Sequence, residues 1–259
     1  MIADLHVHTS HSGCARRDWT PETVVRSAIE SGLDAIGVTD HLWSPDAFDA
    51  LFEVAVRTRE IGQREGLTVF LGAEVETFGV EGDLAILPEQ AARLDYVLAA
   101  SGHLHLDHVR KPPGRTKGDL IDFIHRMNQN LCLNPLVNAV AHPWQAGSAR
   151  YERFGFPPTA AEDYPLDMLA ELGETAARTG TAIELNCSGV NRIEGQSLPA
   201  CAGGVLRLAE GLAPTQALFT LGSDTHGPSG LCRVPMMMEL LPHIGIEPGR
   251  LTVPGKRGG

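Results

Sequence analysis

The chain has 259 residues, of which 43% are hydrophobic, so it can bury a large core as one large domain or two small ones. Asp and Glu number 32 against 21 Lys and Arg, which gives a formal net charge of −11. This acidic balance argues against binding to nucleic acid or to an anionic membrane surface, although it is also common among ordinary soluble proteins.

Short apolar runs alternate along the chain with longer amphipathic segments, a pattern typical of βα units around a parallel sheet. Several of the runs, such as AIGV, TVFL and VNAVA, are continuously hydrophobic, as expected for strands that are buried on both faces. We predict seven strands, at Ile2–Val7, Ala35–Val38, Thr68–Leu71, Tyr96–Ala100, Val137–Ala141, Thr181–Leu185 and Ala217–Leu221.

Helices are predicted between these strands. The first has clear boundaries, with Thr20 at its N-cap, Pro21 at its first position and Gly32 just beyond its end. The other predicted helices are Phe48–Glu65 and Leu166–Arg178, which stop at Gly66 and Gly180, and Leu120–Leu131 and Leu198–Glu210.

The segments that remain are loops. The stretch KPPGRTKGD and residues 147–158 are rich in Gly and Pro and lack periodicity, so we interpret them as surface loops rather than linkers between domains. Residues 1–259 are therefore predicted to form a single domain, with a mobile tail from about residue 252 to residue 259.

The cysteines and the N-terminal residues bear on the compartment. Five cysteines without a CxxC pair do not suggest a disulfide framework, and reduced thiols fit better. The opening MIADLHVHTS lacks the basic and apolar regions of a signal peptide, and no apolar run is long enough to span a bilayer. We expect a cytoplasmic protein that does not associate with membranes; the sequence leaves its oligomeric state open.

A potential metal ligand lies at the end of every predicted strand or just after it. The carboxyl ends of strands in a parallel barrel meet at one mouth, so we expect these side chains to converge there. In chain order they are Asp4, His6 and His8; Asp40 and His41; Glu74 and Glu76; His103 and His105; His142; Glu184 and Asn186; and Asp224 and His226.

The spacing of the histidines supports a metal site. Strand alternation places His6 and His8 on one face, where both imidazoles can reach one ion, and the same holds for Asp224 and His226 if that segment is extended. Nitrogen and oxygen ligands suit Zn, Mn or Fe, and bridging carboxylates suit a multinuclear centre.

Other polar residues have simpler interpretations. Asp4 is predicted either to orient an imidazole or to be a buried structural carboxylate. We expect the remaining isolated histidines to be ordinary core or surface residues, namely His105, His108, His125 and His243.

The motifs DLHVHTSHSGCA, GVTDH, LGAEVE, SGH, AHP and SDTH, in this order, resemble those of the PHP (polymerase and histidinol phosphatase) family. The resemblance covers residues 2–227 and implies an α/β fold, a distorted TIM-like (β/α)7 barrel with a trinuclear metal site at the C-terminal mouth of the strands. The seven strands predicted from hydrophobic patterning agree with it independently. It also implies hydrolysis of a phosphoester by a metal-activated hydroxide.

Carried onto this sequence, the family pattern implies that Glu74 bridges two ions; strand alternation puts Glu76 on the same face, so only the family pattern separates the two. The implied ligand sets are His6, His8, Glu74 and Asp224 for one ion, Glu74, His103 and His142 for a second, and His41 and His226 with one loop residue for a third.

The loop residue of the third set departs from the family pattern, because this chain has Cys14 where many relatives have His or Asp. Three interpretations are open: Cys14 binds the third metal as a thiolate, His11 binds it in place of Cys14, or only two metals bind tightly. We favour the ligand, since a metal lowers the pKa of a thiol and a thiolate suits Zn. Two or three divalent ions are therefore expected.

The resemblance implies a small phosphomonoester substrate, similar to histidinol phosphate or a nucleotide. Glu74, Asp224 and His226 are the candidate catalytic residues, with Asp224 or His226 handling protons. Cationic residues of the mouth loops are candidates for binding phosphate, Arg192 and Arg115 foremost, alongside Lys111, Lys117, Arg150 and Arg153.

Two alternatives remain open. An amidohydrolase-type enzyme also binds metal through HxH, but no Lys follows a middle strand to supply its bridging group. PHP modules also act as 3'-5' exonucleases or as non-catalytic parts of DNA polymerases, although an exonuclease should carry a basic groove that the net charge does not suggest.

Overall fold

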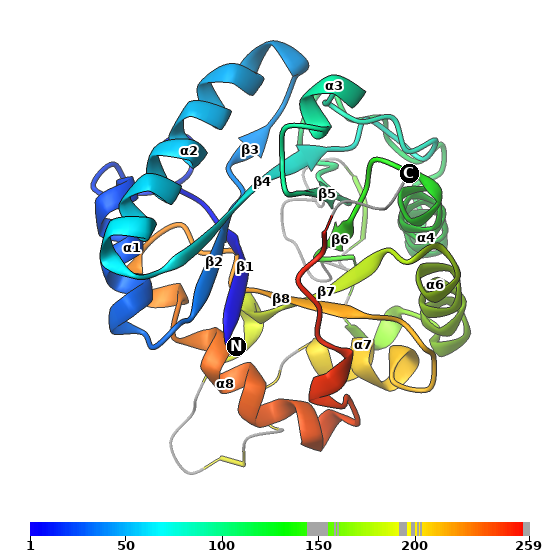
Figure 1. Ribbon diagram of the computed structural model, residues 1–259. Helices are drawn as coiled ribbons and strands as arrows, with labels where there is room; N and C mark the ends of the chain where they lie inside the picture. Colours follow the sequence, from blue (N-terminus) through cyan, green and yellow to red (C-terminus); the bar gives the residue numbers. More distant parts are fainter. Residues whose placement is uncertain are drawn as a thin grey trace.

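The strands form one parallel sheet that curves into a barrel (Figure 1). The computed structural model describes residues 1–143, 155–157, 159, 161–191, 196–197, 200, 202 and 204–255. Strand order is β1-β2-β4-β5-β6-β7-β8, and each neighbouring pair is parallel. The strands are β1 (Ala3–Val7), β2 (Ala35–Val38), β4 (Thr68–Glu76), β5 (Tyr96–Ala100), β6 (Ala139–Ala141), β7 (Ala182–Asn186) and β8 (Phe219–Gly222).

The barrel closes between β1 and the segment that follows β8. The amide of Asp224 donates to the carbonyl of His6 at 2.9 Å, and the amide of His8 donates to the carbonyl of Thr225 at 3.1 Å. Val7 and Thr225 form a parallel bridge at the same place. The seam therefore joins two segments that both carry predicted metal ligands.

The predicted fold class, a TIM-like α/β barrel, is confirmed, and each predicted strand overlaps an observed one. The largest difference is in β4, which extends to Glu76, so Glu74 and Glu76 lie inside the strand rather than after it. A two-residue strand, β3 (His41–Leu42), pairs with β4 and was not predicted, because two residues are too few to show a pattern.

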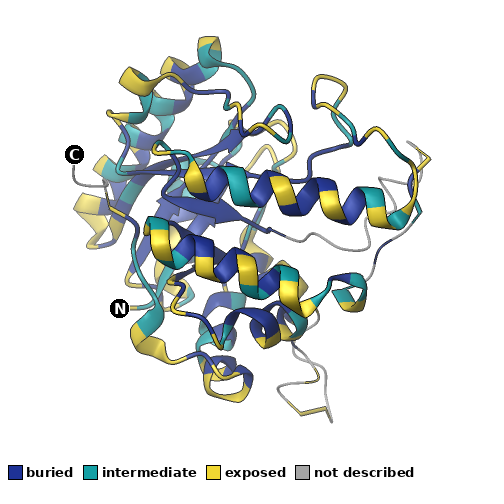
Figure 2. Ribbon diagram, turned by 90° about the vertical axis from the view of Figure 1, so that its right-hand side faces the viewer, coloured by how far each residue is buried: buried dark blue, intermediate teal, exposed yellow. Residues whose placement is uncertain are grey.

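Helices cover the outside of the barrel and turn their buried faces toward the sheet (Figure 2). In the described part of the chain, no helix is both long enough and apolar enough to cross a membrane. The α-helices are α1 (Pro21–Glu30), α2 (Phe48–Glu65), α3 (Pro88–Ala91), α4 (Lys117–Leu133), α6 (Leu166–Thr179), α7 (Val205–Leu212) and α8 (Arg233–Leu240). Short 3-10 turns are η1 (Pro45–Ala47), η2 (Ala161–Asp163), η3 (Cys187–Gly189), η5 (Pro228–Gly230), η6 (Leu241–Ile244) and η7 (Pro248–Arg250).

Most helix boundaries follow their sequence signals. Gly66 and Gly180 end α2 and α6 with φ of 82° and 72°, the left-handed conformation that glycine adopts without strain. The helix predicted over Leu198–Glu210 is wrong at its start, because α7 begins at Val205; several of residues 198–204 lie outside the described part of the chain. Helix α8 was not predicted, since Pro235 interrupts its pattern.

The barrel interior below the mouth is filled by side chains. Tyr96 is buried there among Leu5, Leu98 and small alanines, and its hydroxyl donates to the carbonyl of Leu5 at 2.5 Å. Gly37 and Gly72 leave room for the ring; a Cβ at Gly37 would lie 1.9 Å from the Tyr96 hydroxyl. This packing closes the barrel beneath the mouth, so the polar residues above it face a solid floor.

The last described residues lie at the opposite end of the barrel from the mouth. The amide of Thr252 donates to the carbonyl of Phe219 at 2.9 Å, and the side-chain amide of Asn138 donates to the carbonyl of Gly255 at 2.8 Å. The first half of the tail expected to be mobile is thus hydrogen-bonded to the barrel, whereas residues 256–259 lie outside the described part.

Candidate metal centre

Glu74 lies at the centre of a histidine cluster in the barrel mouth. It is buried in β4, and five imidazoles surround its two carboxylate oxygens. Oε2 lies 2.6 Å from His41 Nδ1, 3.4 Å from His6 Nε2 and 3.5 Å from His8 Nε2, and Oε1 lies 2.7 Å from His142 Nε2 and 3.8 Å from His103 Nε2.

The charge of Glu74 follows from these neighbours. Burial by itself would raise its pKa, but the imidazoles of His41 and His6 and the hydrogen bond with His142 hold the pKa well below its usual range. The carboxylate is therefore ionised, as a bridging metal ligand must be.

His6, His8 and Asp224 form one side of the cluster. The Nε2 atoms of His6 and His8 lie 3.2 Å apart, and Asp224 Oδ1 lies 3.2 Å from His8 Nε2 and 3.6 Å from His6 Nε2. Strand alternation does place both imidazoles on one face. Asp224, however, has φ of 53°, so the segment up to His226 is turned rather than extended.

His41, His226 and Cys14 form the outer side. The His8 ring lies 4.1 Å from the His226 ring and 4.4 Å from the His41 ring, measured between centroids. Partial burial would raise the pKa of the Cys14 thiol, but hydrogen bonds with His226 and His41 lower it to about 6. His11, the other loop candidate, is exposed.

Oxygen atoms orient four of the imidazoles through Nδ1. A carboxylate or carbonyl oxygen can only accept, and the Ser12 hydroxyl donates its own proton to Asp40, so each of these Nδ1 atoms carries a proton and Nε2 is left for a metal. The Nδ1 contacts are His6 with Glu184 Oε1 at 2.7 Å, His103 with Glu76 Oε2 at 2.8 Å, His226 with the carbonyl of Asp224 at 3.0 Å, and His8 with Ser12 Oγ at 3.2 Å.

These contacts separate residues that the sequence left ambiguous. Glu74 is central and Glu76 orients His103, although both lie on the same face of β4. Asp4 Oδ1 accepts hydrogen bonds from the backbone amides of Ser223 at 2.9 Å and His6 at 3.2 Å. Asp4 therefore fixes the backbone of these two segments and does not orient an imidazole. Burial raises the pKa of Asp4 to about 7.

Sequence reasoning missed Trp43, whose indole ring lies 4.3 Å from the His41 ring and stacks on it. A single aromatic residue after a strand gives no periodic signal, so nothing in the sequence singled it out. Ser12 was missed for the same reason; its hydroxyl donates to Asp40 Oδ1 at 2.6 Å while it contacts His8.

The histidines expected to be ordinary lie around or away from the cluster. His125 contacts Glu171 Oε2 at 3.0 Å on the outside of the barrel. His105 and His108 lie at the rim, where the His105 ring is 5.4 Å from that of His103 and the His108 ring is 5.9 Å from that of Phe78.

The candidate phosphate-binding cations in the described part lie on the loop after β5 and the start of α4. Lys111 donates to the carbonyl of Val109 at 2.5 Å, Lys117 pairs with Asp163 at 2.8 Å, and the Arg115 guanidinium lies 4.8 Å above the Phe156 ring. Arg192, Arg150 and Arg153 lie outside the described residues.

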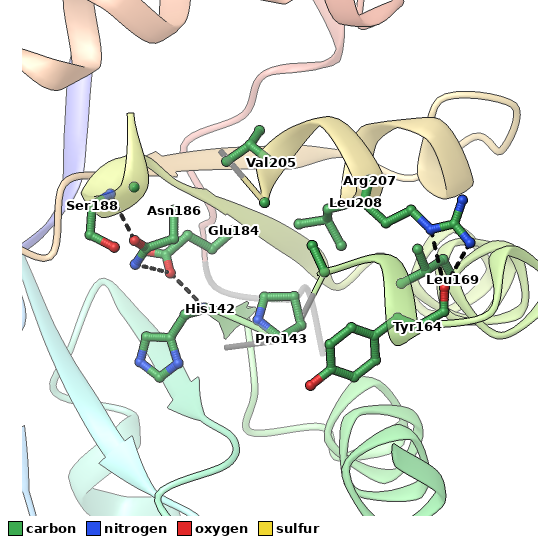
Figure 3. A pocket seen from close by; sticks show the side chains of 13 residues that line it. His142, Pro143, Tyr164, Leu169, Glu184, Asn186, Ser188, Val205, Arg207 and Leu208 are labelled. Atoms are coloured by element: carbon green, nitrogen blue, oxygen red, sulfur yellow. Dashed lines mark hydrogen bonds between the residues drawn. The ribbon is translucent and has the colours of Figure 1, made fainter. Parts of the chain in front are cut away.

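A cavity of about 170 Å³ adjoins the cluster (Figure 3). His142 and Glu184 line one side of it, and the ring of Tyr164 with Leu169 and Leu208 lines the other. Because His142 borders both, a molecule held at the cluster can extend into this cavity.

The residues present fit a set of metal ions. His142 Nδ1 is buried without a hydrogen-bond partner, and Glu74 Oε2 and His41 Nδ1 are buried 2.6 Å apart without the geometry of a hydrogen bond, which is costly unless another ligand satisfies these atoms. Potential ligand atoms gather within 4.8 Å of one another in three overlapping groups: His8, His41 and His226; His6, Glu74 and His142; and His6, His8 and Asp224. Imidazoles with carboxylates suit Zn, Mn or Fe.

Comparison with known proteins places this site in a family. The family model described as PHP domain matches residues 4–188. A probable phosphatase of Proteus mirabilis is 26% identical over 93% of this chain and 85% of its own length, and one of Vibrio campbellii is 25% identical over 97% and 88%. Among solved structures, D-psicose 3-epimerase from Clostridium cellulolyticum matches 100% of this chain and 86% of its own with 13% identity and a TM-score of 0.43, too low a likeness to support an argument. The match of the PHP model to most of the chain, including five of the six histidines around Glu74 and Asp224, shows that the chain belongs to the PHP domain family.

Proposed function

We propose that this protein is a metal-dependent phosphoesterase that hydrolyses a small phosphomonoester. The observation that carries the proposal is the position of Glu74, an ionised carboxylate within 3.8 Å of five imidazoles at the mouth of the barrel. The naming of relatives as probable phosphatases supports the reaction class.

We assign the ligands of three ions from the observed contacts together with the family pattern. Glu74 serves two of them, and Cys14 completes the third, since the imidazoles of His226 and His41 lower the pKa of its thiol. The sets are His6, His8, Glu74 and Asp224; Glu74, His103 and His142; and His41, His226 and Cys14. Bound divalent ions lower the pKa of water and neutralise charge on phosphoryl oxygens.

Asp224 and His226 are the candidates for moving protons. Burial would raise the pKa of Asp224, but the imidazoles of His6 and His8 hold it below its usual range, so this carboxylate is ionised and has no proton to donate. The His226 side chain is 32% exposed against 15% for Asp224, so of the two it is the more accessible to solvent for proton exchange.

The cavity beside His142 receives the organic part of the substrate. Two of its described polar side chains already have partners: Arg207 donates to the carbonyl of Tyr164 at 3.1 Å, and the Asn186 amide donates to Glu184 at 3.1 Å. The surface left to a ligand is mainly apolar, formed by residues such as Val205 and Leu208. This lining favours a monoester of a small uncharged alcohol over a bisphosphate.

The test is a substrate screen on protein stripped with a chelator and reloaded with Zn²⁺, Mn²⁺ or Fe²⁺. The panel contains p-nitrophenyl phosphate, histidinol phosphate, nucleoside monophosphates, single-stranded DNA and cyclic amides. We expect metal-dependent release of phosphate from at least one monoester. Hydrolysis of the amides or DNA alone would favour one of the alternative functions, and inactivity of metal-replete protein on every phosphoester would refute the proposal.

A further inference from the structure

Glu184 links two of the proposed metal ligands from a third strand. It is buried in β7, and its Oε1 lies 2.7 Å from His6 Nδ1, on the side of the ring that faces away from Glu74. Its Oε2 accepts from the backbone amide of His142 at 2.6 Å and from the side-chain amide of Asn186 at 3.1 Å (Figure 3). One carboxylate thereby joins β1, β7 and the turn that follows β6.

We propose that Glu184 is a positioning residue that fixes the proton on His6 Nδ1 and holds the backbone of His142 in place. The inference deepens the proposed function and rests on it in one respect: His6 and His142 are taken as metal ligands. Glu184 contacts His6 Nδ1 and the backbone amide of His142, not the nitrogen atoms that face Glu74. Its role is therefore to position the two ligands rather than to bind the ion.

The backbone conformation of His142 depends on its hydrogen bond with Glu184. His142 has φ of 27°, a positive value that is uncommon for residues other than glycine. Its amide donates to Glu184, and this turn points Nε2 at Glu74 Oε1, 2.7 Å away. Without the Glu184 carboxylate as acceptor, the turn at His142 would lose this hydrogen bond, and the His142 imidazole would no longer be fixed in its position beside Glu74.

The neighbouring strand provides space for this arrangement. Gly222 of β8 lies between Glu184 and His6, and a Cβ there would sit 2.0 Å from Glu184 Oε1 and 2.5 Å from the Cβ of His6. The fold therefore requires a glycine where the carboxylate reaches across from β7 to β1, which is independent support for a specific contact.

The chemistry requires a carboxylate. Each Glu184 oxygen accepts from a different donor, whereas a glutamine has only one acceptor oxygen and must turn its NH₂ group toward His6 or toward the His142 amide. If the NH₂ faces His6, the ring proton moves to Nε2 and removes the lone pair that faces Glu74. If it faces His142, two donors meet in a buried site.

The experiment compares Glu184→Gln with Glu171→Gln in the full-length protein. Glu171 makes a similar contact with His125, at 3.0 Å, but on the outside of the barrel. Zinc affinity is measured by competition with a chromophoric chelator. We expect Glu184→Gln to weaken zinc binding roughly 10- to 100-fold, as is typical for residues that orient a metal ligand, and Glu171→Gln to leave it unchanged. Equal affinity of Glu184→Gln and the wild type would overturn the proposal.

A second measurement does not depend on metal binding. In the metal-free protein, the proton on His6 Nδ1 should give a downfield NMR signal because it is hydrogen-bonded to Glu184, and Glu184→Gln should remove or shift it. If the wild type binds none of Zn²⁺, Mn²⁺ and Fe²⁺, the proposed function fails, and this signal alone then decides the role of Glu184. Absence of the signal from the wild type would also overturn the proposal, even if the variant does not fold.

Discussion

His41 and Glu74 lie directly opposite each other in the β3–β4 pair, and His41 Nδ1 is 2.6 Å from Glu74 Oε2. The contact depends on β4 continuing to Glu76, because β3 pairs with the last residues of this strand. The carboxylate at the centre of the cluster is thus placed by regular strand pairing rather than by a loop.

Replacing this carboxylate should affect more of the site than replacing any one histidine. For Glu74→Gln we expect loss of bound metal and of phosphoesterase activity, by more than the roughly 10- to 100-fold typical of residues that only orient a ligand. The measurement is metal content by mass spectrometry alongside initial rates. Glu76→Gln, which removes the acceptor for His103 alone, is the matched comparison and should be milder. Full metal content in Glu74→Gln would contradict the central position.

The third ion depends on Cys14. Cys14→Ser should lower the metal content by about one ion per chain if the thiolate is a ligand, because a serine hydroxyl is a far weaker donor at neutral pH. Cys232→Ser, at another exposed cysteine, serves as the control and should keep the full count. An unchanged count in Cys14→Ser would remove the thiolate from the ligand set.

The same thiol should be reactive when metal is absent. The pKa of Cys14 is lowered to about 6, so the thiolate fraction rises as the pH increases through that value. We expect alkylation of Cys14 by iodoacetamide, followed by peptide mass spectrometry, to reach half its maximal rate near pH 6 in the metal-free protein and to be suppressed by Zn²⁺. A midpoint above pH 8 would show that His41 and His226 do not stabilise the thiolate.

Asp4 should make the metal-free protein less stable as the pH rises. Burial raises its pKa from 3.8 to about 7, so the folded state holds the proton more tightly than the unfolded state. Its contribution to stability is full below the unfolded pKa and is lost between about pH 4 and pH 7, an effect of up to about 4 kcal/mol. Asp4→Asn should therefore gain stability relative to the wild type across this range. Urea denaturation at several pH values measures the difference, and a pH-independent difference would contradict the assignment.

Tyr96→Phe tests the floor of the barrel. The substitution leaves the buried carbonyl of Leu5 without the hydroxyl that bonds it at 2.5 Å, which we expect to reduce the free energy of unfolding by about 1–3 kcal/mol. Denaturation midpoints at constant slope provide the measurement. Because Tyr96 lies below the metal ligands, metal content should not change; a loss of metal without a loss of stability would mean that the ring instead supports the mouth.

The helices and strands could be predicted where a local rule fixes them. Continuous apolar runs gave the strands, and Gly66 and Gly180 gave the ends of two helices, because left-handed caps favour glycine whatever surrounds them. Strand β3 and the end of β4 could not be predicted in the same way. Their extent depends on pairing between segments distant in the sequence, and Glu74 and Glu76 interrupt the hydrophobic pattern.

By itself, the sequence determined that potential ligands lie at or near the ends of successive strands and that His6 and His8 share a face, since both follow from a parallel barrel and from the two-residue period of a strand. The family pattern favoured Glu74 over Glu76, and only the tertiary structure decided that Asp224 is turned and that Glu184 meets His6 across 178 positions of sequence. The physical reason is that hydrogen-bond partners and ring orientations are set by closure of the barrel, which brings β7 and β8 beside β1. No local sequence pattern encodes contacts between segments so far apart in the chain.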